Sequence, residues 1–97
     1  MTACVEIAAF QDLMARTYGE RDRARGIDAT IAWLTEELGE LARAVRKGTR
    51  DEQRYELGDV LAWLASLAQQ LDLSLEDAAA RYANGCPNCH AMPCACA

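Results

Sequence analysis

The chain has 97 residues, of which 52% are hydrophobic and 26% are charged, with ten Lys and Arg against fifteen Asp and Glu. This length predicts one domain, and the composition is typical of a globular protein and argues against disorder. The formal net charge of −5 opposes nucleic-acid binding through a basic surface but permits a cation site. No apolar run approaches the roughly 18 residues of a membrane span. The first residues also lack the pattern of a signal peptide, so we expect a cytoplasmic protein without membrane or nucleic-acid partners.

Residues 1–85 contain no proline, so nothing in this part of the chain forbids long helices. Apolar residues at spacings of three and four predict a first helix over about 3–18, followed by a charged connector at 19–26. Asp28 is the expected N-cap of a second helix, whose apolar stripe continues until Gly48 ends it.

The second half of this helical part predicts two more helices. Asp51 is the expected N-cap of a third helix, which carries an apolar stripe of the same spacing. Ser74, three residues before Asp77, predicts the start of a short fourth helix that ends near Gly85. No segment alternates polar and apolar residues over the length of a strand. The sequence therefore predicts an all-α fold, an antiparallel bundle of about four helices joined by short connections.

Two acidic pairs with the same spacing lie on the second and third predicted helices. Glu37 and Glu40 are three residues apart, as are Glu56 and Asp59, so each pair shares one helix face. In a hairpin folded about Gly48, Glu37 lies opposite Asp59, and the other two acids lie opposite each other. Four carboxylates at one level repel one another unless they are protonated or share a cation. Oxygen ligands suit Mg²⁺, Mn²⁺ or Ca²⁺, and the alternative is a solvated acidic helix face.

The cysteines divide the chain into a helical body at 1–85 and a Cys-rich tail at 86–97. Four thiols so close together in a reducing compartment predict a structural Zn²⁺ site, in which His90 is a candidate to replace one thiol. A mobile tail and a redox pair of the first two thiols are the alternatives. Cys4 stands apart, and we expect it to be a small buried apolar side chain. The four tail thiols belong to Cys86, Cys89, Cys94 and Cys96.

The acidic motif resembles that of the MazG-like family of all-α nucleoside triphosphate pyrophosphohydrolases. The family carries Glu-Glu-x-x-Glu on one helix and Glu-x-x-Asp on the next, matched here by Glu36-Glu37-Leu-Gly-Glu40 and Glu56-Leu-Gly-Asp59. The text around both motifs also matches, and the resemblance covers nearly the whole chain. It includes the segment Arg21-Asp-Arg-Ala-Arg-Gly26 and the ending Gly85-Cys-Pro-Asn-Cys89.

This resemblance implies that residues 1–85 form a catalytic domain that hydrolyses a (deoxy)nucleoside triphosphate to the monophosphate and pyrophosphate. It also implies Mg²⁺ as the cofactor, with Mn²⁺ as the alternative. The residues that match the family's metal positions are Glu37, Glu40, Glu56 and Asp59. Glu36 and Glu37 are both candidates for the general base that takes the proton of the attacking water.

Aromatic and basic residues near the acidic motif are candidates for substrate contacts. Trp33 and Trp63 face each other in the hairpin register and are candidates to stack a base, although large aromatics more often pack in a core or a dimer interface. Arg21, Arg25 and Lys47 are candidates to contact phosphates. The alternative for the arginines is a solvated surface with salt bridges, and for Lys47 an interaction with the C-terminus of its own helix.

Helices of this length leave apolar surface beyond the needs of one hairpin. Short members of the family assemble as dimers or tetramers, so the resemblance implies a homodimer or homotetramer. Two alternatives to an enzyme are a non-catalytic helical assembly module whose tail recruits a partner, and a regulator in which zinc at the tail controls assembly. The four facing carboxylates favour the hydrolase.

Overall fold

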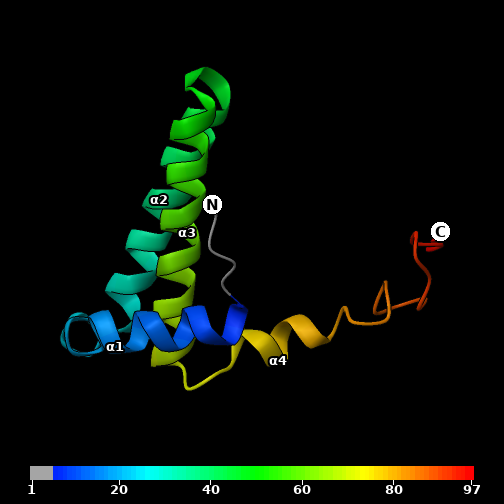
Figure 1. Cartoon of the computed structure of the whole chain (residues 1–97), viewed down its shortest axis with the longest axis horizontal. Coiled ribbons are helices and arrows are strands. Elements are labelled where there is room, and N and C mark those ends of the chain that lie inside the picture. Colours follow the sequence, from blue (N-terminus) through cyan, green and yellow to red (C-terminus); the bar gives the residue numbers. More distant parts are fainter. Residues whose placement is uncertain (1–5) are drawn as a thin grey trace.

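The structure is a computed structural model that describes residues 6–97, and this part of the chain contains four helices and no strand. Helices α2 and α3 form an antiparallel hairpin, α1 lies across the base of the hairpin, and α4 leads away from it toward the C-terminal tail (Figure 1). The all-α prediction is confirmed. The helices span α1 (Ile7–Arg25), α2 (Ile27–Lys47), α3 (Arg50–Gln70) and α4 (Leu75–Ala80).

A tight turn at Gly48 joins the two long helices of the hairpin. The Gly48 amide donates to the Ala44 carbonyl, and a Cβ at this glycine would lie 2.8 Å from the same oxygen. Thr49 is the N-cap of α3, because its hydroxyl accepts from the Glu52 amide while the Glu52 carboxylate accepts from the Thr49 amide. The prediction of Asp51 as the N-cap was therefore wrong. Asp51 lies in the first turn, where its charge still favours the helix N-terminus.

The predicted connector at 19–26 is helical up to Arg25, so this prediction was wrong as well. A glycine inside a helix costs only about 1 kcal/mol, and the packing of the buried Gly19 and Asp22 outweighs that cost. The chain leaves α1 at Gly26, where φ is +89°, a conformation that favours glycine. Gly26 is also the residue that precedes α2, and Asp28, the predicted N-cap, lies in the first turn instead.

The start of α4 is fixed as predicted, but its end is not. The Ser74 hydroxyl accepts from the Asp77 amide at 3.1 Å. The helix ends at Ala80, and turns with hydrogen bonds between residues three apart continue to Gly85, so the predicted end near Gly85 was too late. At the other end of the chain, the predicted start of the first helix near residue 3 lies outside the described residues.

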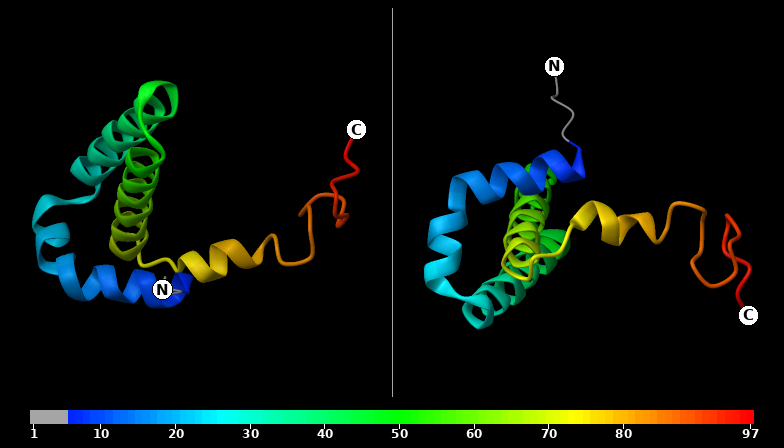
Figure 2. Two further views of the ribbon diagram at one scale, coloured as in Figure 1. Left: turned by 45° about the horizontal axis from the view of Figure 1, so that its top comes forward. Right: turned by 90° about the horizontal axis from the view of Figure 1, so that it is seen from below.

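A buried glutamine ties α1 to the connection between α3 and α4 at the base of the hairpin. The Gln11 side chain on α1 donates to the Leu73 carbonyl at 2.7 Å and accepts from the Leu75 amide at 2.8 Å. It also donates to the Gln69 side chain at 3.3 Å. These contacts hold the connection between α3 and α4 against α1, which curves toward its C-terminal end before it meets α2 (Figure 2).

The core of this single chain is small. Among the described residues, the buried hydrophobic side chains are Ala44, Ala65 and Ala68. Leucines of the apolar stripes predicted for α2 and α3 remain exposed to solvent, with Leu38 56% and Leu57 59% exposed. A monomer rarely leaves so much apolar surface in water, so this surface fits burial against another molecule. Over residues 6–97, no helix combines the length and apolarity that crossing a membrane needs.

Candidate active site

Three carboxylates meet where α2 and α3 run side by side. Glu37, Glu56 and Asp59 each offer an oxygen, and these oxygens lie within 4.8 Å of one another. The charge of Asp59 acts on Glu37 and the charge of Glu40 acts on Glu56, so the members of each pair lie at close range. These two pairs are the ones that the fold about Gly48 predicts, so the register expected from the sequence is confirmed.

The crowding of negative charge shows in the pKa values of two of these acids. Burial raises the pKa of Glu37 to about 7, with further contributions from the charges of Glu40, Asp59 and Glu56. The pKa of Glu56 is raised as well, first by burial and then by its hydrogen bond with Glu40. Near neutral pH the cluster therefore retains protons unless a cation replaces them.

Two oxygens of the cluster lack any hydrogen-bond partner among residues 6–97. They are Oε2 of Glu37 and Oε2 of Glu56, and both atoms are buried. A buried carboxylate oxygen without a donor is costly, whereas it is a ligand that a hard divalent cation prefers. The donor set is made only of oxygens, which suits Mg²⁺ or Mn²⁺. The carboxylates present therefore fit a divalent cation.

The other two predicted acids lie at the margin of this cluster. Glu40 contacts Glu56 but is itself exposed and is not one of the three residues whose oxygens lie within 4.8 Å. Glu36, one of the two candidate bases, is exposed on α2 and lies outside the cluster of the described residues. Successive residues of a helix point about 100° apart, so Glu36 and Glu37 cannot share a face.

The two tryptophans stack against each other, as the hairpin register predicts. Their ring centroids are 5.8 Å apart and their planes differ by 14°. The guanidinium carbon of Arg25 lies over the Trp63 ring, 4.6 Å from its centroid, so α1 adds a cation–π contact to the pair. Trp33 is 46% exposed, and Trp63 is half-buried.

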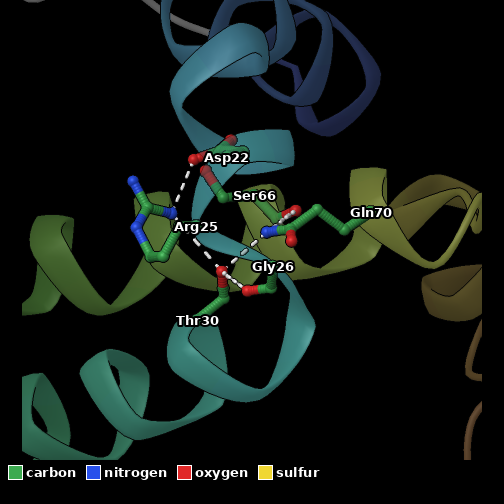
Figure 3. A network of polar contacts seen from close by, with 6 residues as sticks. All are labelled: Asp22, Arg25, Gly26, Thr30, Ser66 and Gln70. Carbon is green, nitrogen blue, oxygen red and sulfur yellow. Dashed lines mark hydrogen bonds and ion pairs between the residues drawn. The ribbon is translucent and has the colours of Figure 1, made fainter.

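A polar network that sequence reasoning missed holds Arg25 in this position (Figure 3). Arg25 donates to the Asp22 carboxylate at 2.8 Å and to the Thr30 hydroxyl at 3.3 Å. Thr30 is fully buried, accepts from Gln70 at 2.7 Å and donates to the Gly26 carbonyl at 2.9 Å. The network thus joins α1, α2 and α3. The available signal was the spacing of three between Asp22 and Arg25, which points to one helix face once the segment is read as helical.

A cavity of about 250 Å³ opens beside this network and reaches the acidic cluster. Arg21, Arg25 and Trp63 line it, together with Asp22 and Asp59. The second carboxylate oxygen of Asp22 is buried and has no hydrogen-bond partner in the described part of the chain. The cavity therefore combines an aromatic face, two arginines and an unpaired acceptor next to the carboxylates.

A wider groove lies on the other side of the cluster, toward the turn of the hairpin. Its charged lining consists of two basic residues, Arg43 and Lys47, and of four acids, Glu40, Asp51, Glu52 and Glu56, of which Glu56 belongs to the cluster. The structure thus brings Lys47 near the acids, and it adds Arg43, which sequence reasoning did not single out. Two basic side chains among these acids suit a ligand that carries both phosphate and bound cations.

The carboxylate cluster lies in a segment of the chain that matches a known protein family. The MazG nucleotide pyrophosphohydrolase domain family matches residues 25–90, about two thirds of the chain. The chain belongs to the MazG family. It is 50% identical over 60 residues to the uncharacterized protein YpjD of Bacillus subtilis, a match that covers 52% of this chain and 54% of YpjD. It is also 32% identical over 90 residues to the Gene 37 protein of Mycobacterium phage L5, covering 81% of this chain and 79% of that protein. The chain thus spans only about half the length of YpjD.

The MazG match contains both tryptophans and the five acids of α2 and α3 named above, but it begins only at Arg25. Arg21 and Asp22 therefore line the cavity from a part of the chain that precedes the matched domain. In the tail, the four predicted zinc ligands lie together, with all four sulfurs within 4.8 Å. Cys4 lies outside the described residues.

Proposed function

We propose that this MazG protein is a divalent-metal-dependent nucleoside triphosphate pyrophosphohydrolase, which converts a (deoxy)nucleoside triphosphate and water to the monophosphate and pyrophosphate. The observation that carries the proposal is the compact cluster of Glu37, Glu56 and Asp59. Two buried oxygens of this cluster have no hydrogen-bond partner among the described residues. Residues 1–85 are the catalytic domain in this account, and the Cys-rich tail at 86–97 stands outside it. A nucleotide substrate fits the cytoplasmic location expected from the sequence.

The metal ligands we propose are Glu37, Glu56 and Asp59, with Glu40 at the edge of the site. Mg²⁺ or Mn²⁺ held there supplies neutralisation of the triphosphate and a lowered pKa of the attacking water. Without a cation, the carboxylates repel the negatively charged triphosphate. They can therefore bind the substrate only through a divalent cation.

We assign the proton transfer to Glu37. The water oxygen attacks the α-phosphorus, the bond from this phosphorus to the bridging oxygen breaks, and pyrophosphate leaves with the electron pair. The water proton passes to the Glu37 carboxylate, which lies inside the cluster next to the other proposed metal ligands. Glu36 is the alternative base, but its exposed position outside the cluster favours Glu37.

The substrate contacts we propose lie on both sides of the cluster. The cavity lined by Trp63, Arg25 and Arg21 is the site for the base and sugar, because it offers an aromatic face and nitrogen donors next to Asp59. Lys47, with Arg43, is placed to meet phosphates in the groove. Trp33 does not line the cavity, so its contribution is to support Trp63 by stacking, or to contact the base after a rearrangement.

The assembly we propose is a homodimer or homotetramer. The exposed leucines and valines of α2 and α3, such as Leu38, Val45 and Leu57, are the surface that a second copy covers. This surface is also what a non-catalytic assembly module would use. The two functions are separated by turnover, because only the enzyme needs the carboxylate cluster.

The experiment is product analysis with the purified full chain and a panel of NTPs and dNTPs, with and without Mg²⁺. The proposal predicts monophosphate and pyrophosphate in equal amounts, and only with Mg²⁺ or Mn²⁺. Turnover should fall by about 10²–10⁴-fold in Glu37→Gln, and Glu76→Gln on α4, away from the cluster, is the matched control. A folded, assembled protein that turns over no member of the panel would favour the assembly module.

A further inference from the structure

The tail carries a second cluster of potential ligands, remote from the carboxylates. Figures 1 and 2 show the tail beyond α4, on the side away from the hairpin. The Cys86 and Cys96 sulfurs are 3.6 Å apart, and those of Cys89 and Cys94 are 4.0 Å apart. Four sulfurs around one zinc ion at about 2.3 Å form a tetrahedron with edges of about 3.8 Å. The two distances bracket that edge.

The backbone of the tail folds back to bring the first two cysteines together. The His90 amide donates to the Cys86 carbonyl at 2.7 Å, and the Cys86 amide donates to the Ala91 carbonyl at 3.1 Å. Gly85 precedes this turn with φ at +93°, and a Cβ there would lie 2.8 Å from the Ala91 carbonyl oxygen. Only glycine fits this position, so the turn that presents the Cys-x-x-Cys segment is specified by the sequence.

Backbone amides also point at the sulfurs. The Ala95 amide donates to the Cys89 sulfur at 3.3 Å, and the Cys96 amide donates to the Cys94 sulfur at 3.4 Å. Hydrogen bonds of this kind stabilise a thiolate, the form of cysteine that binds a metal. They support the geometry, which stands without them.

The sulfur–sulfur distances and the composition of the tail favour a single bound metal ion over disulfides or a small hydrophobic core. A disulfide needs sulfurs about 2.05 Å apart, much closer than either pair here. The tail has little apolar material to bury, and Met92 is 88% exposed, so no hydrophobic core holds its turn. In such a short segment, a metal supplies the folding free energy that a core cannot.

We propose that Cys86, Cys89, Cys94 and Cys96 bind one structural zinc ion through four thiolates and thereby close the tail into a small knuckle. All four coordination positions are filled by protein sulfur, as in closed structural zinc sites, so no position is open for a substrate or water. His90 lies next to the second cysteine but is not part of the cluster of four sulfurs, so it is not a ligand. The site acts independently of the proposed hydrolysis.

The test measures the metal content of the full chain, purified under reducing conditions from zinc-supplied cells. The proposal predicts one zinc per chain, and a loss of about tenfold or more in Cys86→Ser and in Cys94→Ser. One matched control is Cys4→Ser, which removes a thiol elsewhere in the sequence. The other is His90→Asn, because asparagine tolerates the positive φ of 60° at this position. Both controls should keep one zinc per chain.

A second measurement uses the unaltered chain and does not depend on any variant folding. Replacement of zinc by Co²⁺ should give intense visible bands of a tetrahedral ion with sulfur-to-cobalt charge transfer, which four thiolates produce. Absence of both zinc and a cobalt spectrum overturns the proposal. Stoichiometric iron in place of zinc, or loss of zinc in His90→Asn, also overturns it. So do two disulfides detected by mass spectrometry in protein purified under reducing conditions. None of these readouts involves nucleotide hydrolysis, so a failed hydrolase assay leaves this result unaffected.

Discussion

The indole rings of Trp33 and Trp63 stack with their centroids 5.8 Å apart, one from each arm of the α2–α3 hairpin. This contact sets the level at which the two helices meet. One turn farther along, the same register brings Glu37 to Asp59. The apolar contact thus helps to hold together carboxylates that repel each other, in the arrangement that a cation stabilises.

Replacement of Glu37 separates catalysis from folding. Glu37→Gln removes a buried negative charge and the proposed base, so turnover should fall by about 10²–10⁴-fold while the helical signal in circular dichroism is retained. The loss of repulsion should leave the melting temperature without metal unchanged or higher. Glu36→Gln is the informative comparison, since an equal loss of turnover in that variant would shift the proton transfer to Glu36.

The raised pKa of Glu37 makes stability depend on pH in a definite direction. Its pKa is about 7 in the folded chain against 4.5 in the unfolded chain, so the folded state binds more protons between these values. Stability without metal should therefore fall as pH rises from about 4.5 to 7. A divalent cation replaces the proton, so the increase in melting temperature on adding Mg²⁺ should be larger at pH 8 than at pH 5. An equal increase at both pH values would contradict a site at Glu37.

The buried ion pair of Asp22 and Arg25 should matter more than an exposed pair of similar geometry. Asp22→Asn leaves Arg25 without its charged partner, and we expect a loss of about 1–3 kcal/mol in the free energy of unfolding. The matched control is Asp12→Asn, whose pair with Arg16 is 68% and 67% exposed and should contribute about 0–1 kcal/mol. Urea unfolding of both variants measures the difference, and equal losses would contradict the structural role of the network.

Asp22→Asn also tests whether the cavity beside Trp63 binds the substrate. If Arg25 binds substrate, Asp22→Asn should raise KM more than it lowers kcat, because Arg25 loses the contact that holds it over Trp63. A fall in kcat alone, with KM unchanged, would place Arg25 outside the substrate site.

The exposed hairpin surface predicts how the chain assembles. Light scattering coupled to size exclusion should give a dimer or tetramer for the unaltered chain. Leu57→Glu places a charge on the surface that we assign to a second copy, and it should shift the chain toward the monomer. Leu73→Glu, at an equally exposed leucine outside the hairpin, is the control and should keep the assembly. A monomeric unaltered chain would contradict the proposed interface.

The sequence predicted the part of the fold that depends on periodicity and on one tight turn. Because Gly48 ends α2 and the hairpin turn is short, the facing of Glu37 with Asp59 and of Trp33 with Trp63 followed from counting residues outward. The close spacing of the four tail cysteines in the sequence predicted a shared metal site, and their sulfurs do lie together.

Sequence reasoning failed where tertiary contacts override local preference. Gly19 and a dense run of charges predicted a connector at 19–26, but burial of Asp22 and its pair with Arg25 keep this segment helical. Arg21 and Arg25 of this segment were still named as candidate substrate contacts, but the network of Arg25 with Asp22 and Thr30 was missed. The N-cap of α3 was missed for a local reason, since Thr49 completes a reciprocal capping box that Asp51 does not.

The proposed reaction requires water to attack the α-phosphorus. It is tested most directly by hydrolysis in ¹⁸O-labelled water with Mg²⁺, followed by mass spectrometry of both products. The label should appear in the nucleoside monophosphate and not in the pyrophosphate, and Glu37→Gln should form labelled monophosphate about 10²–10⁴-fold more slowly. Label in the pyrophosphate, or in orthophosphate, would contradict it.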